Sequence, residues 1–587
     1  MMTFYRCFLR LAGLVGLVVL LVLPALPGRA QLATWQPSVL IESVGNGNSH
    51  ITAVAPAPNG DLYVAGNVSG SARLGNRNYS STGGSDGFVA RYQPGTNTVV
   101  WLLPLTGTTD EQVAQLVVSG SSLYLTGQFS SSSLTVGSRT LANTYVPGSS
   151  TFDGFALKLT DEGLQARTEW LYQLGGPENE SVSALAVAGI TVYLGGHFSS
   201  PALNLGAAAV LSNPTSLSTN PTTNGFVLAL EDAGTAATLR WALPVGGDGL
   251  EDVKVLAVSG PTVYVGGEYS PLGNSVATFG TLPLPVSGSL HGYVGKITDG
   301  GTQGVAQWVE PLSNGQFTNL YALAASGSTV YVGGTYYGTA FALGPDVLPY
   351  LSRSEIYVAQ LNDAGAQPYW AWARAAAGAG YDHVYALAAD AQGVYLAGQF
   401  NSPTLAFGPV TLSNSSTVPG STDDLFISYL SAGGTFGATQ QVGGPGNAAL
   451  GALTLANGLL HVGGSFNEVA TFGTQSYTAP NGGYTSFAGT VAARVLGTAS
   501  ATALPGLTLA PNPAHGRAAL HLPAGTGATP FIISILDGLG RVMQRREVAA
   551  TASGQTTPLE LAGLAPGVYA VRVQQGPAQA VQRLVVE

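Results

Sequence analysis

The chain repeats one short strand seven times, and this repetition constrains its fold more than any other feature. Each copy is apolar, carries one tyrosine or histidine, and ends in glycine, as in Leu62-Tyr63-Val64-Ala65-Gly66. The closing glycines are Gly66, Gly127, Gly196, Gly267, Gly334, Gly398 and Gly464. Their mean spacing of about 66 residues predicts a repeat architecture, in which each unit buries its apolar face only against its neighbours.

Each repeat predicts four short strands. A strand of pattern V-x-A-L comes before the glycine strand, and strands centred on an aromatic residue and on a tryptophan follow it. The V-x-A-L strands are 51–54, 113–116, 182–185, 253–256, 320–323, 384–387 and 450–453. The third-strand aromatics are Phe88, Phe155, Phe226, Tyr293, Tyr357, Phe426 and Phe487. The fourth-strand residues are Trp35, Trp101, Trp170, Trp241, Trp308 and Trp370, with Phe436 standing in for tryptophan in one copy. Such alternating segments between Gly, Asn and Asp turns predict antiparallel sheets.

The two ends of the repeat region predict how it closes. The region begins with a lone tryptophan strand at Trp35 and ends with a third strand at Phe487, so one unit is complete only if the ends meet. Closure removes exposed sheet edges, whereas an open solenoid needs no divided unit. We therefore expect an all-β protein in which residues 31–496 form a seven-bladed β-propeller closed by N- and C-terminal strands.

The repeats resemble the bacterial SBBP-like β-propeller repeats, which are built on strands such as "VYVAG" and "DAFVAKL" and an "LGG" turn. The matching text is "DLYVAG" and "DGFVARY" within 61–92, "DGFALKL" at 153–159 and "QLGGPENE" at 173–180. The resemblance implies the propeller fold and no particular activity. The extra length between second and third strands, as in 211–224, predicts flexible surface loops.

Residues 1–30 have the pattern of a secretory signal peptide. Arg6 and Arg10 precede an apolar run from Leu11 to Leu23, and small residues at Gly28 and Ala30 suit cleavage. The run is too short for a stable membrane anchor, so we expect no transmembrane anchor in the mature chain. The single cysteine, Cys7, lies inside this segment. The mature chain therefore has no disulfide, thiol nucleophile or thiolate metal ligand.

The C-terminal region differs from the repeats. Residues 497–505 read as a linker, and 506–587 contain alternating strands that suit a small β-sandwich. This region resembles the type A C-terminal sorting domain of Gram-negative type IX secretion (Por) substrates. The matching residues are Pro511, Asn512, Pro513, Gly540, Arg541, Pro566, Gly567, Tyr569 and Arg583. The resemblance implies export through the type IX machinery to the outer cell surface or the medium. The alternative is an ordinary terminal sandwich used for binding.

Composition and motifs narrow the function classes. Charged residues make up 9% of the chain, and the three lysines form no basic stripe, so we expect no nucleic-acid partner. The sequence has no H-E-x-x-H, G-x-S-x-G, P-loop or dinucleotide motif. His461 occupies a strand position that tyrosine holds in the other copies, so packing is its simplest explanation. We expect neither enzymatic activity nor a cofactor.

One polar column is a candidate ligand site. It lies two residues before each V-x-A-L strand and reads Ser49, Glu111, Glu180, Glu251, Thr318, Asp382 and Ala448. If those strands are innermost, Glu111, Glu180, Glu251 and Asp382 ring one mouth of a central channel. Carboxylate rings suit calcium or hydroxyl-rich ligands. The alternative is that these acids only keep loop tips soluble.

Three functions fit the sequence. The first is a secreted or surface-displayed, non-enzymatic binding or adhesion protein for glycan or another surface protein. The second is a polysaccharide-acting enzyme that uses the mouth carboxylates as acid and base. The third is a structural spacer without a discrete ligand. Near-symmetric acids argue against the enzyme, because catalysis usually rests on a few unique residues.

Overall fold

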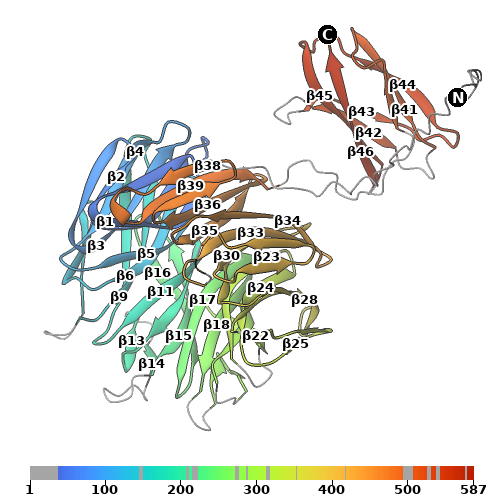
Figure 1. The fold of residues 1–587 in the computed structure, drawn as a ribbon. Helices are drawn as coiled ribbons and strands as arrows, with labels where there is room; N and C mark the ends of the chain where they lie inside the picture. Colours follow the sequence, from blue (N-terminus) through green and yellow to red (C-terminus); the bar gives the residue numbers. More distant parts are fainter. Residues whose placement is uncertain are drawn as a thin grey trace, which may run out of the picture. The chain divides into compact units, whose positions relative to one another are not determined.

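The computed structural model describes two compact parts, one within Gln31–Val495 and the other within Leu496–Glu587 (Figure 1). The described residues are 37–144, 150–205, 210–213, 222–271, 276–285, 289–312, 317–351, 353–416, 418, 420–493, 507–524, 530–536, 542–575 and 578–587. The predicted signal peptide, Trp35 and the predicted linker lie outside them.

The described residues are almost entirely strands and turns. They contain no α-helix, and one 3-10 turn occurs at Pro480–Gly482. No helix in this part of the chain is therefore long and apolar enough to cross a membrane. The chain is therefore an all-β protein in the part that the structure describes.

The larger part contains seven groups of four antiparallel strands, which we call sheets 1 to 7 in chain order. The first strands are β1 (Val39–Pro56), β5 (Glu111–Ser119), β11 (Glu180–Ala188), β17 (Leu250–Ser259), β23 (Thr318–Ser326), β29 (Asp382–Asp390) and β35 (Ala448–Ala456). The second strands are β2 (Leu62–Leu74), β6 (Ser122–Phe129), β12 (Thr191–Phe198), β18 (Thr262–Ser270), β24 (Thr329–Tyr336), β30 (Gly393–Phe400) and β36 (Leu459–Phe466). The third strands are β3 (Arg77–Gln93), β9 (Asp153–Asp161), β15 (Asn224–Asp232), β21 (His291–Asp299), β27 (Glu355–Asp363), β33 (Asp424–Ser431) and β39 (Thr485–Ala492). The fourth strands of sheets 1 to 6 are β4 (Thr98–Thr106), β10 (Ala166–Leu174), β16 (Ala237–Gly246), β22 (Gly304–Leu312), β28 (Pro368–Gly378) and β34 (Phe436–Gly443).

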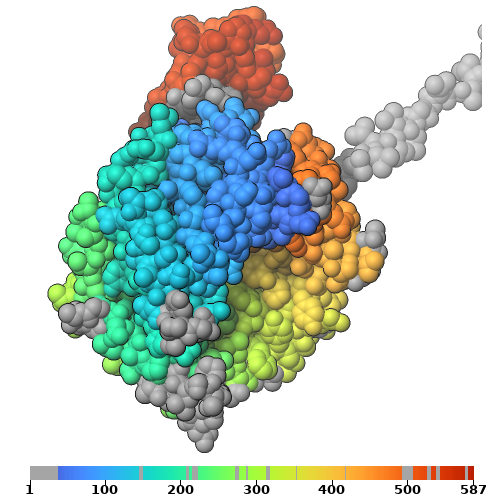
Figure 2. Space-filling model, turned by 90° about the vertical axis from the view of Figure 1, so that its left-hand side faces the viewer, coloured from blue at the N-terminus to red at the C-terminus, as the bar shows by residue number. Residues whose placement is uncertain are grey.

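The strand β1 belongs to two sheets. Its beginning, Val39–Ile41, pairs with β39 as the fourth strand of sheet 7, and from Ile41 to Pro56 it pairs, with two interruptions of register, with β2 in sheet 1. The first strands of successive sheets contact one another, and β35 of sheet 7 contacts β1 of sheet 1. In Figure 2 the N-terminal surface accordingly lies beside that of the last repeat strands. The larger part is propeller-like.

Each first strand contains a β-bulge at the same place, the variable x of V-x-A-L. The register skips Thr52, Ala114, Ser183, Lys254, Tyr321, Tyr385 and Gly451. The bulge explains the repeated glycines of the second strands, because a Cβ at any of those seven glycines would lie within 2.3 Å of a first-strand carbonyl oxygen. At Gly127 and Gly196, the added Cβ would also collide with a third-strand aromatic ring, Phe155 and Phe226 respectively. The glycines therefore let three strands approach closely.

The repeated tyrosines and tryptophans join neighbouring sheets. In sheet 2, the Tyr124 hydroxyl and the Trp170 indole donate hydrogen bonds of 2.7 and 3.0 Å to Asp232, which ends the third strand of sheet 3. Lys158 completes the cluster with an ion pair of 2.6 Å. Although burial opposes it, these donors hold the pKa of Asp232 below its ordinary value. Equivalent aspartates stand at Asp161, Asp299 and Asp363.

Where the aspartate is absent, the partners change. Pro94, Ala432 and Ala493 occupy its position in sheets 1, 6 and 7. His461, which faces the sheet with Pro94, bonds instead to Thr490 at 3.1 Å. Buried packing was expected for His461, and it is 4% exposed.

Two fourth-strand assignments are corrected by the register. Trp372, not Trp370, occupies the position of the other tryptophans, because it pairs with Gln360, three residues before Asp363 at the end of the third strand. Its ring lies 6.0 Å from that of Tyr331. Phe436 does not replace the missing tryptophan of sheet 6, because it pairs with Leu430. Tyr429 packs on Tyr395 there instead, with ring centroids 4.9 Å apart.

The inserts between second and third strands contain hairpins, where flexible loops were predicted. These are β7 (Ser133–Val136) with β8 (Arg139–Ala142), β13 (Ala202–Asn204) with β14 (Val210–Ser212), β19 (Thr278–Phe279) with β20 (Leu282–Pro283), β25 (Phe341–Leu343) with β26 (Asp346–Leu348), β31 (Thr404–Phe407) with β32 (Val410–Ser413), and β37 (Val469–Phe472) with β38 (Gln475–Thr478). Four of them pair with the fourth strand of the preceding sheet. Their apolar residues are buried; Phe407, for example, lies 4.9 Å from Phe426.

The smaller part contains two antiparallel sheets. One consists of β40 (Thr508–Ala510), β41 (Arg517–Leu522) and β44 (Gln555–Glu560). The other consists of β43 (Val542–Val548), β42 (Phe531–Leu536), β45 (Gly567–Gln575) and β46 (Ala578–Val586). One hydrophobic cluster takes side chains from both sheets, including Leu520, Leu559, Ile533 and Val571.

Candidate functional site

The four predicted carboxylates lie at the starts of first strands, but they are buried. Glu111, Glu180, Glu251 and Asp382 are all 0% exposed. Asp382 accepts a hydrogen bond from Ser402, and Glu111 and Glu180 contact the equivalent Ser131 and Ser200. These carboxylates, candidates from the sequence for a ring at one mouth of a central channel, are thus buried in the structure. Successive side chains of a strand point to opposite faces, and this column points into the protein.

Burial changes the protonation of these groups. It raises the pKa of Glu111 and Glu251 to about 7, of Glu180 to about 8 and of Asp382 to about 6. A nearby second carboxylate adds to the rise in each case, as Asp153 does for Glu180. These side chains therefore bind protons near neutral pH. No three His, Cys, Asp or Glu side chains gather into a metal-binding group within the described ranges.

The column one residue later is the more accessible one. Gln112 is exposed, and Ser181, Asp252 and His383 are half-buried. One of these side chains bonds between sheets: Asp252 of sheet 4 contacts His197 of sheet 3 at 3.1 Å. Burial lowers the pKa of His197, but the hydrogen bond and charge of Asp252 outweigh it and raise the pKa overall. Because neighbouring residues of a strand face opposite sides, the acids are buried while the polar residues one position later in each strand are accessible.

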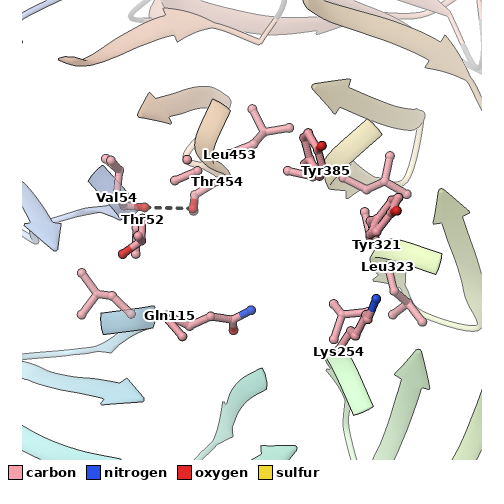
Figure 3. Close-up of a pocket in the computed structure, with 18 of the residues that line it drawn as sticks. Thr52, Val54, Gln115, Lys254, Tyr321, Leu323, Tyr385, Leu453 and Thr454 are labelled. Atoms are coloured by element: carbon pink, nitrogen blue, oxygen red, sulfur yellow. Dashed lines mark hydrogen bonds between the residues drawn. The ribbon is translucent and has the colours of Figure 1, made fainter. Parts of the chain in front are cut away.

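The bulged residues surround a central cavity of about 320 Å³ (Figure 3). Its wall comes from the first strands of six sheets: β1, β5, β17, β23, β29 and β35. Polar bonds connect the first strands: Thr454 of β35 donates to the Val54 carbonyl of β1 at 2.9 Å, and Gln115 of β5 accepts from the Leu185 amide of β11 at 3.1 Å. β-Bulges commonly redirect a side chain at such sites.

One side of this cavity differs from the rest. Lys254, Tyr321 and Tyr385 occupy the bulge position in sheets 4, 5 and 6, whereas Thr52, Ala114 and Gly451 occupy it in sheets 1, 2 and 7. The Lys254 ammonium lies 5.1 Å from the centre of the Tyr321 ring and 2.6 Å from Glu268. The Tyr321 and Tyr385 rings are 5.5 Å apart. The cavity therefore has one aromatic and cationic wall.

His383 supports this wall from behind. Its ring stacks on Tyr385 at 5.6 Å with an interplanar angle of 16° and contacts Tyr321 edge-on at 6.1 Å. Burial lowers the pKa of His383, so the ring is neutral near pH 7. Sequence reasoning missed these residues, although one signal was available. The x of V-x-A-L is the most variable place in the strand, and three neighbouring copies fill it with large polar residues.

Glu180 also contributes to a second cavity. This cavity, of about 360 Å³, lies between sheets 2 and 3 and is also lined by Gln128, Ser181 and His197. The Ser200 amide donates to Glu180 at 3.3 Å.

Among the predicted sorting residues that the structure describes, Asn512 and Tyr569 make hydrogen bonds within the smaller part. The Asn512 side chain accepts a hydrogen bond of 2.8 Å from the Val585 amide and donates to the Arg583 carbonyl, so it fastens β46 to the segment after β40. Pro511 and Pro513 flank it, both after cis peptide bonds. The Tyr569 hydroxyl donates to the Ala565 carbonyl at 2.8 Å, which spans the turn containing Pro566 and Gly567. Gly540 and Arg541 lie outside the described residues.

Residues 508–587 match the secretion system C-terminal sorting domain family. The match confirms the predicted sorting domain and indicates export by type IX secretion to the cell surface or the outside. It also implies interaction with the secretion machinery.

Comparisons with solved structures find distant likenesses for the whole chain. Acylaminoacyl peptidase of Pyrococcus horikoshii is 8% identical with a TM-score of 0.30; the match covers 79% of this chain but only 57% of the peptidase. The hemagglutinin-neuraminidase of parainfluenza virus 5 is 9% identical over 70% of this chain and 93% of that one, with a TM-score of 0.31. Drosophila semaphorin 2a is 7% identical over 95% and 99%, also at 0.31. A comparison with curated proteins finds no match. The fold assignment therefore rests on the strand pairing.

Proposed function

We propose that this chain is an exported, non-enzymatic binding protein of the cell surface or extracellular space. The observation that supports this proposal most strongly is the central cavity, in which large polar side chains, Lys254, Tyr321 and Tyr385, occupy the bulge position on one side only. Packing alone favours the same residue in every repeat. A concave site with a few convergent polar groups is instead the usual form of a ligand site.

The proposal includes a closed seven-bladed propeller of SBBP-like repeats, with a C-terminal β-sandwich as the sorting domain. The pairing of Val39–Ile41 with β39 and the contact between β35 and β1 support closure. The hydrophobic cluster shared by both C-terminal sheets supports the sandwich. Residues 1–30 serve as the signal peptide, 31–496 as the propeller, 497–505 as the linker and 506–587 as the sorting domain.

A polysaccharide-acting enzyme is the second candidate, and the raised pKa of Glu180 beside the second cavity favours it. A general acid needs such a pKa. Glycoside hydrolysis, however, needs a pair of carboxyl groups flanking the sugar bond. Glu180 is fully buried and held by Ser200, which suits an internal structural acid better than a group that reaches a polymer.

The test uses the full chain, exported by a bacterium with type IX secretion and purified from the surface or medium. The protein is applied to arrays of glycans and of extracellular matrix proteins, and is assayed against a panel of polysaccharides for release of reducing ends. Saturable binding without hydrolysis is expected. Hydrolysis would establish the enzyme instead, and silence in both assays would favour a structural spacer.

A further inference from the structure

We infer that the central cavity binds the neutral saccharide end of a glycan, with Tyr321 and Tyr385 as the stacking surface. This inference rests on the proposed binding function and names its site and ligand class. Its volume of about 320 Å³ lies at the lower end of the range for small-ligand pockets, which suits one or two sugar rings.

The bulge position is free to serve a ligand. Its residue has no register partner in the neighbouring strand, so its side chain is not required for strand pairing. In the same strand of sheet 6, Val384 just before it and Leu387 two residues after it stay apolar and buried. Tyr385 nevertheless remains 40% exposed at the cavity. An aromatic ring held open at the centre of a packed protein is better explained by contact with a ligand than by the fold.

The aromatic wall is held in place before any ligand arrives. His383 stacks behind Tyr385, and Glu268 holds the Lys254 ammonium at 2.6 Å above the Tyr321 ring. Side chains fixed in this way lose little conformational freedom on binding, which favours affinity. The wall is therefore preorganised.

The chemistry of the two sides suits a sugar. One face of a sugar ring is lined by C–H groups, which pack on aromatic rings, and its edge carries hydroxyl groups that need hydrogen-bond partners. The tyrosine hydroxyls and Lys254 supply partners on one side. Across the cavity, the Gln115 side chain reaches into the hollow and Thr52 lies beside it (Figure 3).

Charge favours a neutral saccharide over an acidic one. The Lys254 charge is offset by Glu268, whose pKa burial raises although the ammonium lowers it. The remaining lining residues, Thr52, Gln115, Tyr321 and Tyr385 among them, carry no formal charge at pH 7. A quaternary ammonium ligand is disfavoured, because the Lys254 ammonium beside the Tyr321 ring would repel a second positive charge, whereas it does not repel a neutral sugar.

The experiment measures binding of the full chain to a panel of neutral disaccharides and uronic-acid disaccharides by calorimetry. Tyr385→Ala is expected to weaken binding of the neutral ligand at least tenfold, while Tyr385→Phe, which keeps the ring, changes it less than threefold. Tyr369→Ala is the matched control, since Tyr369 is 56% exposed on β28 and does not line the cavity. It is expected to leave binding unchanged.

A second variant keeps the proposal testable if Tyr385→Ala unfolds. Ala114→Trp fills the cavity from the opposite side and is expected to abolish binding in a protein whose thermal midpoint is retained. Saccharide binding that both variants leave intact, or binding of uronic-acid ligands alone, would overturn the inference while leaving the proposed binding function standing. If the wild-type chain binds no ligand on any array, both the saccharide inference and the proposed binding function are wrong.

Discussion

The hydroxyl of Tyr124 donates a hydrogen bond of 2.7 Å to Asp232 on the following sheet, and the Lys158 ammonium lies 2.6 Å from the same carboxylate oxygen. A hydrogen bond to a charged acceptor contributes roughly 1.5–3 kcal/mol. The repeated tyrosine is therefore a connection between sheets as well as part of each sheet's core.

Tyr124→Phe is expected to lower the free energy of unfolding by roughly 1.5–3 kcal/mol, because Asp232 loses one buried donor. Chemical denaturation of the full chain measures the change. Tyr331→Phe is the matched control, since Ala432 stands where the next sheet would supply the aspartate. Equal losses in both variants would show that ring packing, not the hydrogen bond, matters at this position.

Stability should fall as the pH rises. Burial raises the folded-state pKa of Glu180 to about 8, above its ordinary value of 4.5. The folded state thus binds a proton more tightly than the unfolded state. Its stabilising contribution is complete below pH 4.5 and is lost as pH rises through about 8. Glu180→Gln, which stays neutral, is expected to be roughly 2–4 kcal/mol more stable than wild type at pH 9, and the difference should shrink toward pH 5.

Thermal unfolding measured from pH 5 to pH 9 checks this prediction. Glu178→Gln removes an exposed acid two residues away and serves as the control. A Glu180→Gln variant with the same pH profile as wild type would contradict the expected protonation.

Gly196→Ala is expected to prevent folding of the larger part or to cost more than about 4 kcal/mol. The added Cβ would lie 1.9 Å from the Ser181 carbonyl oxygen and 3.1 Å from the Phe226 ring. Gly433→Ala, whose Cβ would come no closer than 3.8 Å to a neighbouring atom, should be tolerated. Yield of soluble protein and its thermal midpoint separate the two variants.

Asn512→Ala is expected to reduce export. It removes the bonds that fasten β46 to the segment after β40 and leaves the Val585 amide without its side-chain acceptor, at a cost of about 1–3 kcal/mol. The protein should accumulate inside the cell envelope while the secreted fraction falls severalfold, as measured by immunoblotting of the medium. Met543→Ala, an exposed residue on β43, should be secreted like wild type. Normal export of both variants would show that the machinery does not read this end of the domain.

The sequence predicted the repeated strands well because their causes are local. Glycine, aromatic residue and apolar alternation all follow from strand packing within one sheet. Trp372 was missed because Trp370 lies two residues away and both suit a strand, and only the pairing with Gln360 separates them. The burial of Glu111 and Asp382 could not be predicted for a similar reason: it depends on which face of the first strand meets the next sheet.

The candidate site was harder to predict than the fold. Lys254, Tyr321 and Tyr385 lie about 65 residues apart in the chain and become neighbours only through the packing of three sheets. A bulge is invisible in sequence, so the alternation rule alone assigns these side chains no place at the cavity. Comparing the same position across repeats, and asking where it stops being uniform, would have found them.

Because β1 pairs with both β2 and β39, the first residues of the larger part complete their pairing only with the last strand of that part. Val39 pairs with Ala488, so the final interface forms only after every intervening repeat has been delivered. Such distant pairing slows folding. Proteolysis or premature termination anywhere between Val39 and Ala488 would leave the start of β1 without its partner strand, and an unpaired strand edge is open to aggregation. The pairing of β1 with β39 thus forms only in a chain that contains every repeat between them.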